Sequence, residues 1–128
     1  MKFLNYMNLI IIMCLMTMCQ PATTSIGPEL FEDMLNQTSN PQLIDVRTPA
    51  EFADGYLEGA KLIDISQPNF ETLINQLDKS RPVFVYCRLG RRSLTAARIL
   101  EKNDFKLVYN LEGGIVAWRN DCKPVVYE

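Results

Sequence analysis

The sequence predicts an α/β fold in which a parallel sheet carries helices on both faces. Short apolar runs typical of buried strands alternate with segments whose apolar residues recur at helical spacing. The run from Pro82 to Cys87 is so apolar and so rich in β-prone residues that we expect a central strand, buried on both sides. Because ligands of such folds gather at the carboxyl ends of the strands, Cys87 is placed where a site is expected.

The remaining elements follow the same two patterns in order along the chain. Helices are expected over residues 28–35, 69–77 and 91–102, with a single turn at 50–53 and a last helix that begins at Gly113 and Gly114 and includes Trp118 as a core anchor. Strands are expected over residues 42–46, 61–65, 82–87 and 105–111, between proline and glycine turn signals.

Composition narrows the classes of function. The 128 residues and 48% apolar content are those of one globular domain. The formal charge of -2, from 13 basic and 15 acidic residues, lacks the basic excess of nucleic-acid binding proteins, so no nucleic-acid partner is expected. Histidine is absent, and the four cysteines form neither a CxxC pair nor a set of metal-ligand spacings. No metal and no cofactor are expected.

Residues 1–19 differ from the rest of the chain. Lys2 is their only charge, and the apolar run that ends at Cys19 is shorter than the roughly 20 residues of a membrane-spanning helix, so we interpret the segment as an export signal. It resembles a bacterial lipoprotein signal, which makes Cys19 a lipidation candidate; simple cleavage and an uncleaved anchor are the alternatives. Residues 20–27 are then expected to form a tether, and residues 28–128 a domain that is periplasmic or anchored to the membrane outside the cytoplasm.

The loop after the central strand carries the candidate chemistry. Backbone N–H groups of such a loop and the start of the following helix stabilise an anion, and three arginines add positive charge. A free cysteine with a pKa of about 8.5 is only about 3% thiolate at pH 7, so these fields would activate it. The candidate residues are Cys87 as nucleophile and Arg88, Leu89, Gly90, Arg91, Arg92 and Ser93 as substrate-binding residues. The alternative is that Cys87 is only a small buried side chain.

Three segments of this chain resemble the rhodanese family, in the family's order. They are residues 43–52 (LIDVRTPAEF), the loop of residues 87–93 (CRLGRRS) and residues 110–118 (NLEGGIVAW). The resemblance implies a rhodanese-like parallel sheet and a persulfide carried on Cys87. Related phosphatases resemble Cys-x5-Arg, which would need arginine at position 93, where this chain has Ser93. The shorter loop favours sulfur over phosphate.

Residues outside the loop are assigned supporting roles. Asp45 and Arg47 could pair near the loop or support the sheet, with Glu51 joining them, and a structural role is the interpretation adopted. Tyr56 stands where many relatives have a histidine. Cys122 could be inert or could act as a resolving thiol.

The expected function is a sulfurtransferase that moves a sulfane sulfur through a Cys87 persulfide from a small donor to a thiol or cyanide acceptor. The alternatives are a non-catalytic rhodanese-like binding module and a thiol redox protein that uses Cys87 and Cys122.

Overall fold

The computed structural model describes residues 22–128 of the chain. The expected export signal and Cys19 lie outside the described residues. Within the described part, no helix combines the length and apolar character needed to cross a membrane.

Five parallel strands form one sheet in the order β1-β5-β4-β2-β3. The strands are β1 (Thr23–Ile26), β2 (Gln42–Asp45), β3 (Lys61–Leu62), β4 (Val83–Tyr86) and β5 (Val108–Leu111), and the helices are α2 (Pro28–Gln37), α3 (Pro49–Ala53), α4 (Phe70–Ile74), α5 (Arg91–Lys102) and α6 (Gly114–Asn120). The predicted α/β fold with a parallel sheet is confirmed.

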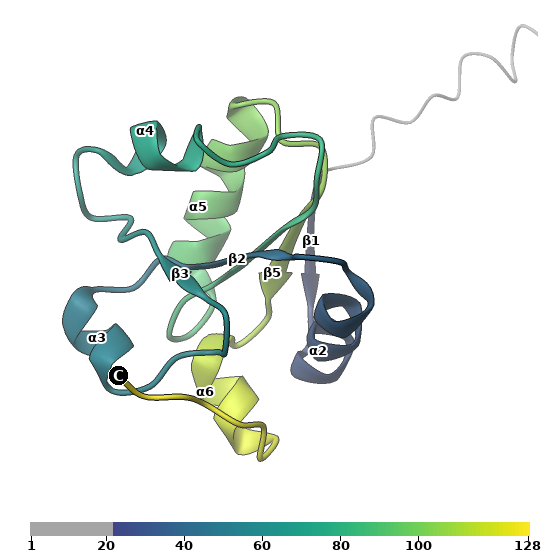
Figure 1. The fold of residues 1–128 in the computed structure, drawn as a ribbon, viewed down its shortest axis with the longest axis vertical. Helices are drawn as coiled ribbons and strands as arrows, with labels where there is room; N and C mark the ends of the chain where they lie inside the picture. The colour runs from purple at the N-terminus through teal and green to yellow at the C-terminus, as the bar shows by residue number, and fades with distance from the viewer. Residues whose placement is uncertain (1–21) are drawn as a thin grey trace, which may run out of the picture.

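Helices cover both faces of the sheet, which separates the core into two clusters (Figure 1). On one face α4 and α5 pack against β4, with Ala97 and Leu100 of α5 in the same cluster as Cys87. On the other face α2 and α6 supply Phe31 and Trp118. Trp118 is buried, as the sequence predicts for a core anchor.

The strand β4 is the centre of the sheet. It pairs with β2 on one side and β5 on the other, and all four of its residues are buried. The prediction of a central, doubly buried strand is therefore confirmed. Since Cys87 follows directly, the nucleophile candidate is attached to the most constrained part of the backbone.

The expected tether over residues 20–27 is wrong for its second half. Thr23–Ile26 form β1, which pairs in parallel with β5, so the folded domain begins before residue 28. Only Ile26 of this strand is buried, and an edge strand without apolar alternation gives no sequence signal. Three other elements are shorter than expected: β3 has two residues, α4 ends at Ile74, and β5 begins at Val108.

The C-terminal segment after α6 packs back onto the domain. Val126 forms an antiparallel bridge with Tyr56, and the indole N–H of Trp118 donates to the carbonyl of Pro124 at 2.8 Å. Lys123 forms an ion pair with Glu32 of α2 at 2.9 Å. These contacts tie the segment to α2 and to the loop that leads to β3.

We predict that Phe84→Ala strongly destabilises the domain. Phe84 is fully buried in β4, packed edge-on against Phe31 with ring centroids 5.5 Å apart, and truncation of such a phenylalanine costs about 3–5 kcal/mol. Urea unfolding followed by circular dichroism measures this loss. The matched control is Leu30→Ala, at a half-exposed position on α2, which should change stability by less than about 0.5 kcal/mol. Equal effects of the two changes would contradict the assigned core.

Candidate active site

The side chain of Cys87 is buried at the carboxyl end of β4, at the start of a tight loop that leads into α5. Gly90 has a positive φ of 95°, which lets the chain reverse direction just before the helix. A Cβ at this position would lie 3.2 Å from the backbone nitrogen of Gly113, so the loop also needs glycine for close packing. The turn brings the first residues of α5 around the sulfur.

Hydrogen-bond donors surround the sulfur of Cys87. The backbone N–H of Gly90 donates at 3.0 Å and the hydroxyl of Ser93 at 3.3 Å. Burial alone would raise the pKa of the Cys87 thiol, but the Ser93 hydroxyl and the backbone N–H groups of Ser93, Gly90 and Leu89 outweigh it, so the pKa lies below the ordinary value. The loop is therefore built to hold a thiolate.

The carbonyl groups at the start of the loop are bound by α6. The N–H of Ile115 donates to the carbonyl of Cys87 at 2.9 Å, and the N–H of Val116 donates to that of Arg88 at 3.2 Å. Gly114 makes this approach feasible, because a Cβ there would overlap the Arg88 carbonyl. The carbonyls are thereby turned away from the sulfur, and the N–H groups face it.

The three arginines of the loop have different surroundings. Arg88 and Arg91 are exposed, whereas Arg92 is half-buried. Together with Leu89, they line a shallow pocket of about 240 Å³ that opens onto Cys87. An anionic ligand that enters this pocket meets positive charge before it reaches the sulfur.

Arg92 pairs with Glu51 of α3. Its Nη1 and Nη2 atoms donate to the two carboxylate oxygens at 2.8 and 2.7 Å, a bidentate, end-on geometry. These bonds lower the pKa of Glu51 to about 2, so the pair stays ionised at neutral pH. The suggestion that Glu51 joins Asp45 and Arg47 is wrong: its hydrogen bonds go to Arg92 and Thr48.

Asp45 and Arg47 form a buried pair behind the site. Three of their contacts are 2.7–3.0 Å long, and Arg47 also donates to the carbonyl of Gly55 at 2.8 Å. Burial alone would lower the pKa of Arg47, but Asp45 acts in the opposite direction. The pKa therefore lies above its ordinary value, and the guanidinium stays charged. Arg47 thereby holds the loop before β3, Asp45 holds Arg47, and neither side chain lines the Cys87 pocket. Their arrangement is that of structural residues.

Tyr86, the residue before Cys87, forms a buried polar cluster together with Asp45 and Arg47. Its hydroxyl accepts the N–H of Leu57 at 3.0 Å, and burial and the Asp45 carboxylate raise its pKa. The neutral phenol therefore links β4 to the segment before β3. Sequence reasoning missed this role, because a tyrosine in an apolar strand gives the same pattern as a phenylalanine.

Two other residues lie outside the pocket. Tyr56 stacks on Phe52, with ring centroids 3.9 Å apart, and its N–H bonds to Val126. Cys122 is exposed in the turn after α6, and both cysteines of the described chain are free thiols.

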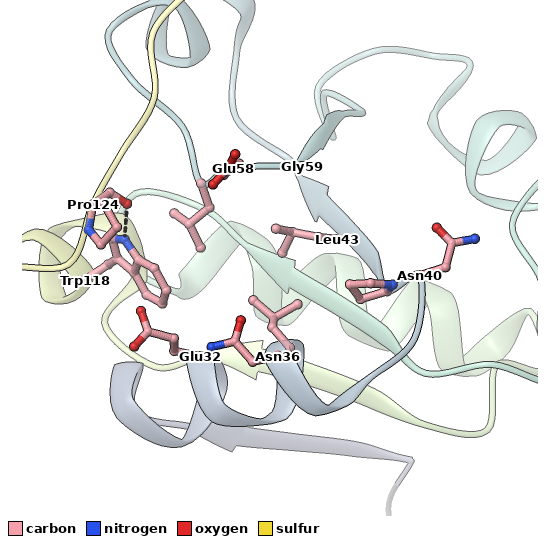
Figure 2. Close-up of a pocket in the computed structure, with 11 residues that line it drawn as sticks. Glu32, Asn36, Asn40, Leu43, Glu58, Gly59, Trp118 and Pro124 are labelled. Carbon is pink, nitrogen blue, oxygen red and sulfur yellow. Dashed lines mark hydrogen bonds between the residues drawn. The ribbon is translucent and has the colours of Figure 1, made fainter.

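A larger pocket of about 390 Å³ lies on the other face of the sheet (Figure 2). Leu43, Leu57 and Trp118 form its apolar part, and Glu32 and Glu58 lie at its edge. Its lining contains no cysteine, serine, threonine or lysine, and the sheet separates it from Cys87. The chemistry of the fold is therefore centred on the smaller pocket.

Fold and site define a class of protein with a parallel α/β sheet and an activated cysteine in a loop of N–H donors. The sequence matches the rhodanese-like domain family over residues 27–121. The chain belongs to the rhodanese-like family.

Relatives and solved structures agree with this assignment. The chain is 35% identical over 101 residues to a sulfurtransferase of Allochromatium vinosum, which covers 79% of this chain and 92% of that protein. It is 33% identical over 84 residues to the thiosulfate sulfurtransferase GlpE of Shewanella oneidensis, covering 66% and 81%.

A rhodanese-like domain protein of Staphylococcus aureus has a TM-score of 0.71 at 30% identity, over 82% of this chain and 98% of that one. The polysulfide-sulfur transferase homodimer of Wolinella succinogenes has a TM-score of 0.70 at 28% identity, over 84% and 80%. The rhodanese-like parallel fold predicted from the sequence is thus confirmed.

We predict that Ser93→Ala raises the pH at which Cys87 becomes reactive. The change removes one donor to the thiolate, so the pKa of Cys87 moves up toward that of a free thiol. The measurement is the rate of alkylation by iodoacetamide against pH, followed on the peptide that contains Cys87. Thr95→Ala, at an exposed position of the same helix, is the control and should leave the midpoint in place. An unchanged midpoint in folded Ser93→Ala protein would exclude the hydroxyl as a thiolate donor.

Proposed function

We propose that this protein is a sulfurtransferase that carries a sulfane sulfur on Cys87 as a persulfide. The observation that carries the proposal is the set of hydrogen-bond donors directed at the Cys87 sulfur. These donors keep the pKa of the Cys87 thiol below its ordinary value. Relatives named sulfurtransferase and thiosulfate sulfurtransferase support it.

The reaction needs two attacks on sulfur. The Cys87 thiolate attacks the outer sulfur of a donor such as thiosulfate; a new S–S bond forms, and sulfite leaves with the electron pair of the old one. Cyanide or a thiolate then attacks the outer sulfur of the persulfide, and the Cys87 thiolate is released. The N–H groups that stabilise the thiolate at the start stabilise it again as the leaving group at the end.

The charge around the pocket favours an anionic donor. Arg88 and Arg91 are exposed at the pocket and face solvent, while the chain as a whole is weakly acidic. Local positive charge on such a protein raises the concentration of anions at the site, and this attraction weakens with salt.

Intact-mass measurement tests the proposal directly. After incubation of the reduced protein with thiosulfate, we expect a gain of about 32 Da on Cys87, the mass of one sulfur, which cyanide removes. Cys87→Ser should abolish both the gain and the transfer while circular dichroism shows a folded domain. Cys122→Ser, which changes an exposed thiol outside the pocket, should retain both. Absence of any gain in folded wild-type protein would favour a non-catalytic binding module.

We also propose that the protein is exported and that Cys19 becomes its lipidated N-terminus, on the basis of the apolar run that ends at this residue. Expression in a bacterial host with labelled palmitate should place label on the wild-type chain and on Cys14→Ala, but not on Cys19→Ala. Label on none of the three would leave simple cleavage or an uncleaved anchor, which N-terminal sequencing distinguishes.

A further inference from the structure

The ion pair between Glu51 and Arg92 joins two elements that do not otherwise belong to one site. Glu51 lies in α3, and Arg92 lies in the first turn of α5. The two parallel hydrogen bonds of this end-on pair fix both the position and the orientation of the guanidinium, which a single contact would not do. The first turn of α5 is therefore held from outside the loop.

That first turn contains donors to the nucleophile. Gly90 and Ser93, on either side of Arg92 along the chain, both donate to the sulfur of Cys87. The charge of the Cys87 thiolate also acts on the guanidinium of Arg92. A change in the position of Arg92 therefore affects the Cys87 sulfur in two ways, through the backbone of the turn and through the charge of the guanidinium.

Glu51 is itself fixed before it meets Arg92. Its carboxylate accepts the N–H of Thr48 at 3.1 Å, and its own N–H donates to the Thr48 hydroxyl at 3.3 Å, which is a capping box at the start of α3. The arginine therefore binds a carboxylate whose position is already set by a helix end.

We propose that Glu51 is a positioning residue of the active site, which acts through Arg92 to hold the first turn of α5 around the Cys87 sulfur. The importance of this role for catalysis rests on the proposed function, whereas the support of the loop by Glu51 and Arg92 does not depend on it. It assigns different tasks to the three arginines: Arg92 supports the loop, and Arg88 and Arg91 attract the donor. The other charged group that acts on Arg92 is Asp45, which is already bound to Arg47.

Two substitutions separate the support of the loop from the capping of α3. Glutamine still serves at the third position of a capping box, so Glu51→Gln keeps the cap but turns an amide toward the arginine. Thr48→Ala removes the capping hydroxyl, which also donates to the Glu51 carboxylate at 3.1 Å, but it keeps the backbone N–H of residue 48 and both bonds between Arg92 and Glu51. The second variant is the matched control, and its melting temperature should fall.

The first readout is alkylation of Cys87 by iodoacetamide against pH in the full chain, which requires no sulfur transfer. We expect Glu51→Gln and Arg92→Gln each to raise the midpoint, and the double variant to raise it no further than either one. Thr48→Ala, which keeps both bonds between Arg92 and Glu51, should raise it by less than either. A midpoint that stays in place in Glu51→Gln, or falls, would overturn the proposal; a fall would mean that the carboxylate only neutralises the arginine.

The second readout is steady-state transfer from thiosulfate to cyanide. Glu51→Gln should lower kcat by about threefold or more with less than about a twofold change in KM for thiosulfate, because the two exposed arginines remain. A rise in KM alone would overturn the division of tasks among the arginines. If wild-type protein transfers no sulfur but the alkylation midpoints shift as expected, the proposed function fails and the positioning role stands.

Discussion

The arrangement of the site depends on the hydrogen bonds by which α6 binds the first two carbonyl groups of the loop. A loop that directs several N–H groups inward at one sulfur must direct its carbonyls elsewhere, and a buried carbonyl without a donor is costly. Ile115 and Val116 supply these donors, and Gly114 lets their backbone come close enough. The last helix is consequently part of the site, although none of its side chains lines the pocket.

A second constraint is the cluster of polar residues buried behind the site. Asp45, Arg47 and Tyr86 are almost fully buried, so each needs its partners. Their bonds reach the backbone at Gly55 and Leu57 and therefore fix the segment that connects α3 to β3. Since Tyr86 directly precedes Cys87, the same group also fixes the end of β4. Asp45, Arg47 and Tyr86 therefore determine the shape of the site, whereas the residues of the Cys87 loop carry the chemistry.

The sequence predicted the elements whose pattern is strong. The central strand and α5 agree with the structure almost residue for residue, because apolar burial dictates both. The strand β1 was missed, since it is ordered by the hydrogen bonds of β5 and has little apolar surface of its own. Within the site the nucleophile and its loop could be found from residue type and position. The pairing of Glu51 with Arg92 could not, because 41 residues separate them and only the packing of α3 against the loop decides which arginine the carboxylate meets.

The balance between burial and hydrogen bonding at Cys87 has a consequence for where charge lies during transfer. Burial opposes the thiolate, so the anion is stable only while the donors of the folded loop surround it. In the cycle proposed above, the persulfide places the transferred sulfur one S–S bond of about 2 Å beyond the buried Cys87 sulfur. Because Cys87 borders the pocket lined by Arg88 and Arg91, the transferred sulfur would reach this pocket, where an acceptor can attack it. A buried nucleophile and an open pocket are therefore compatible, because the atom that is handed on is not the atom that is buried.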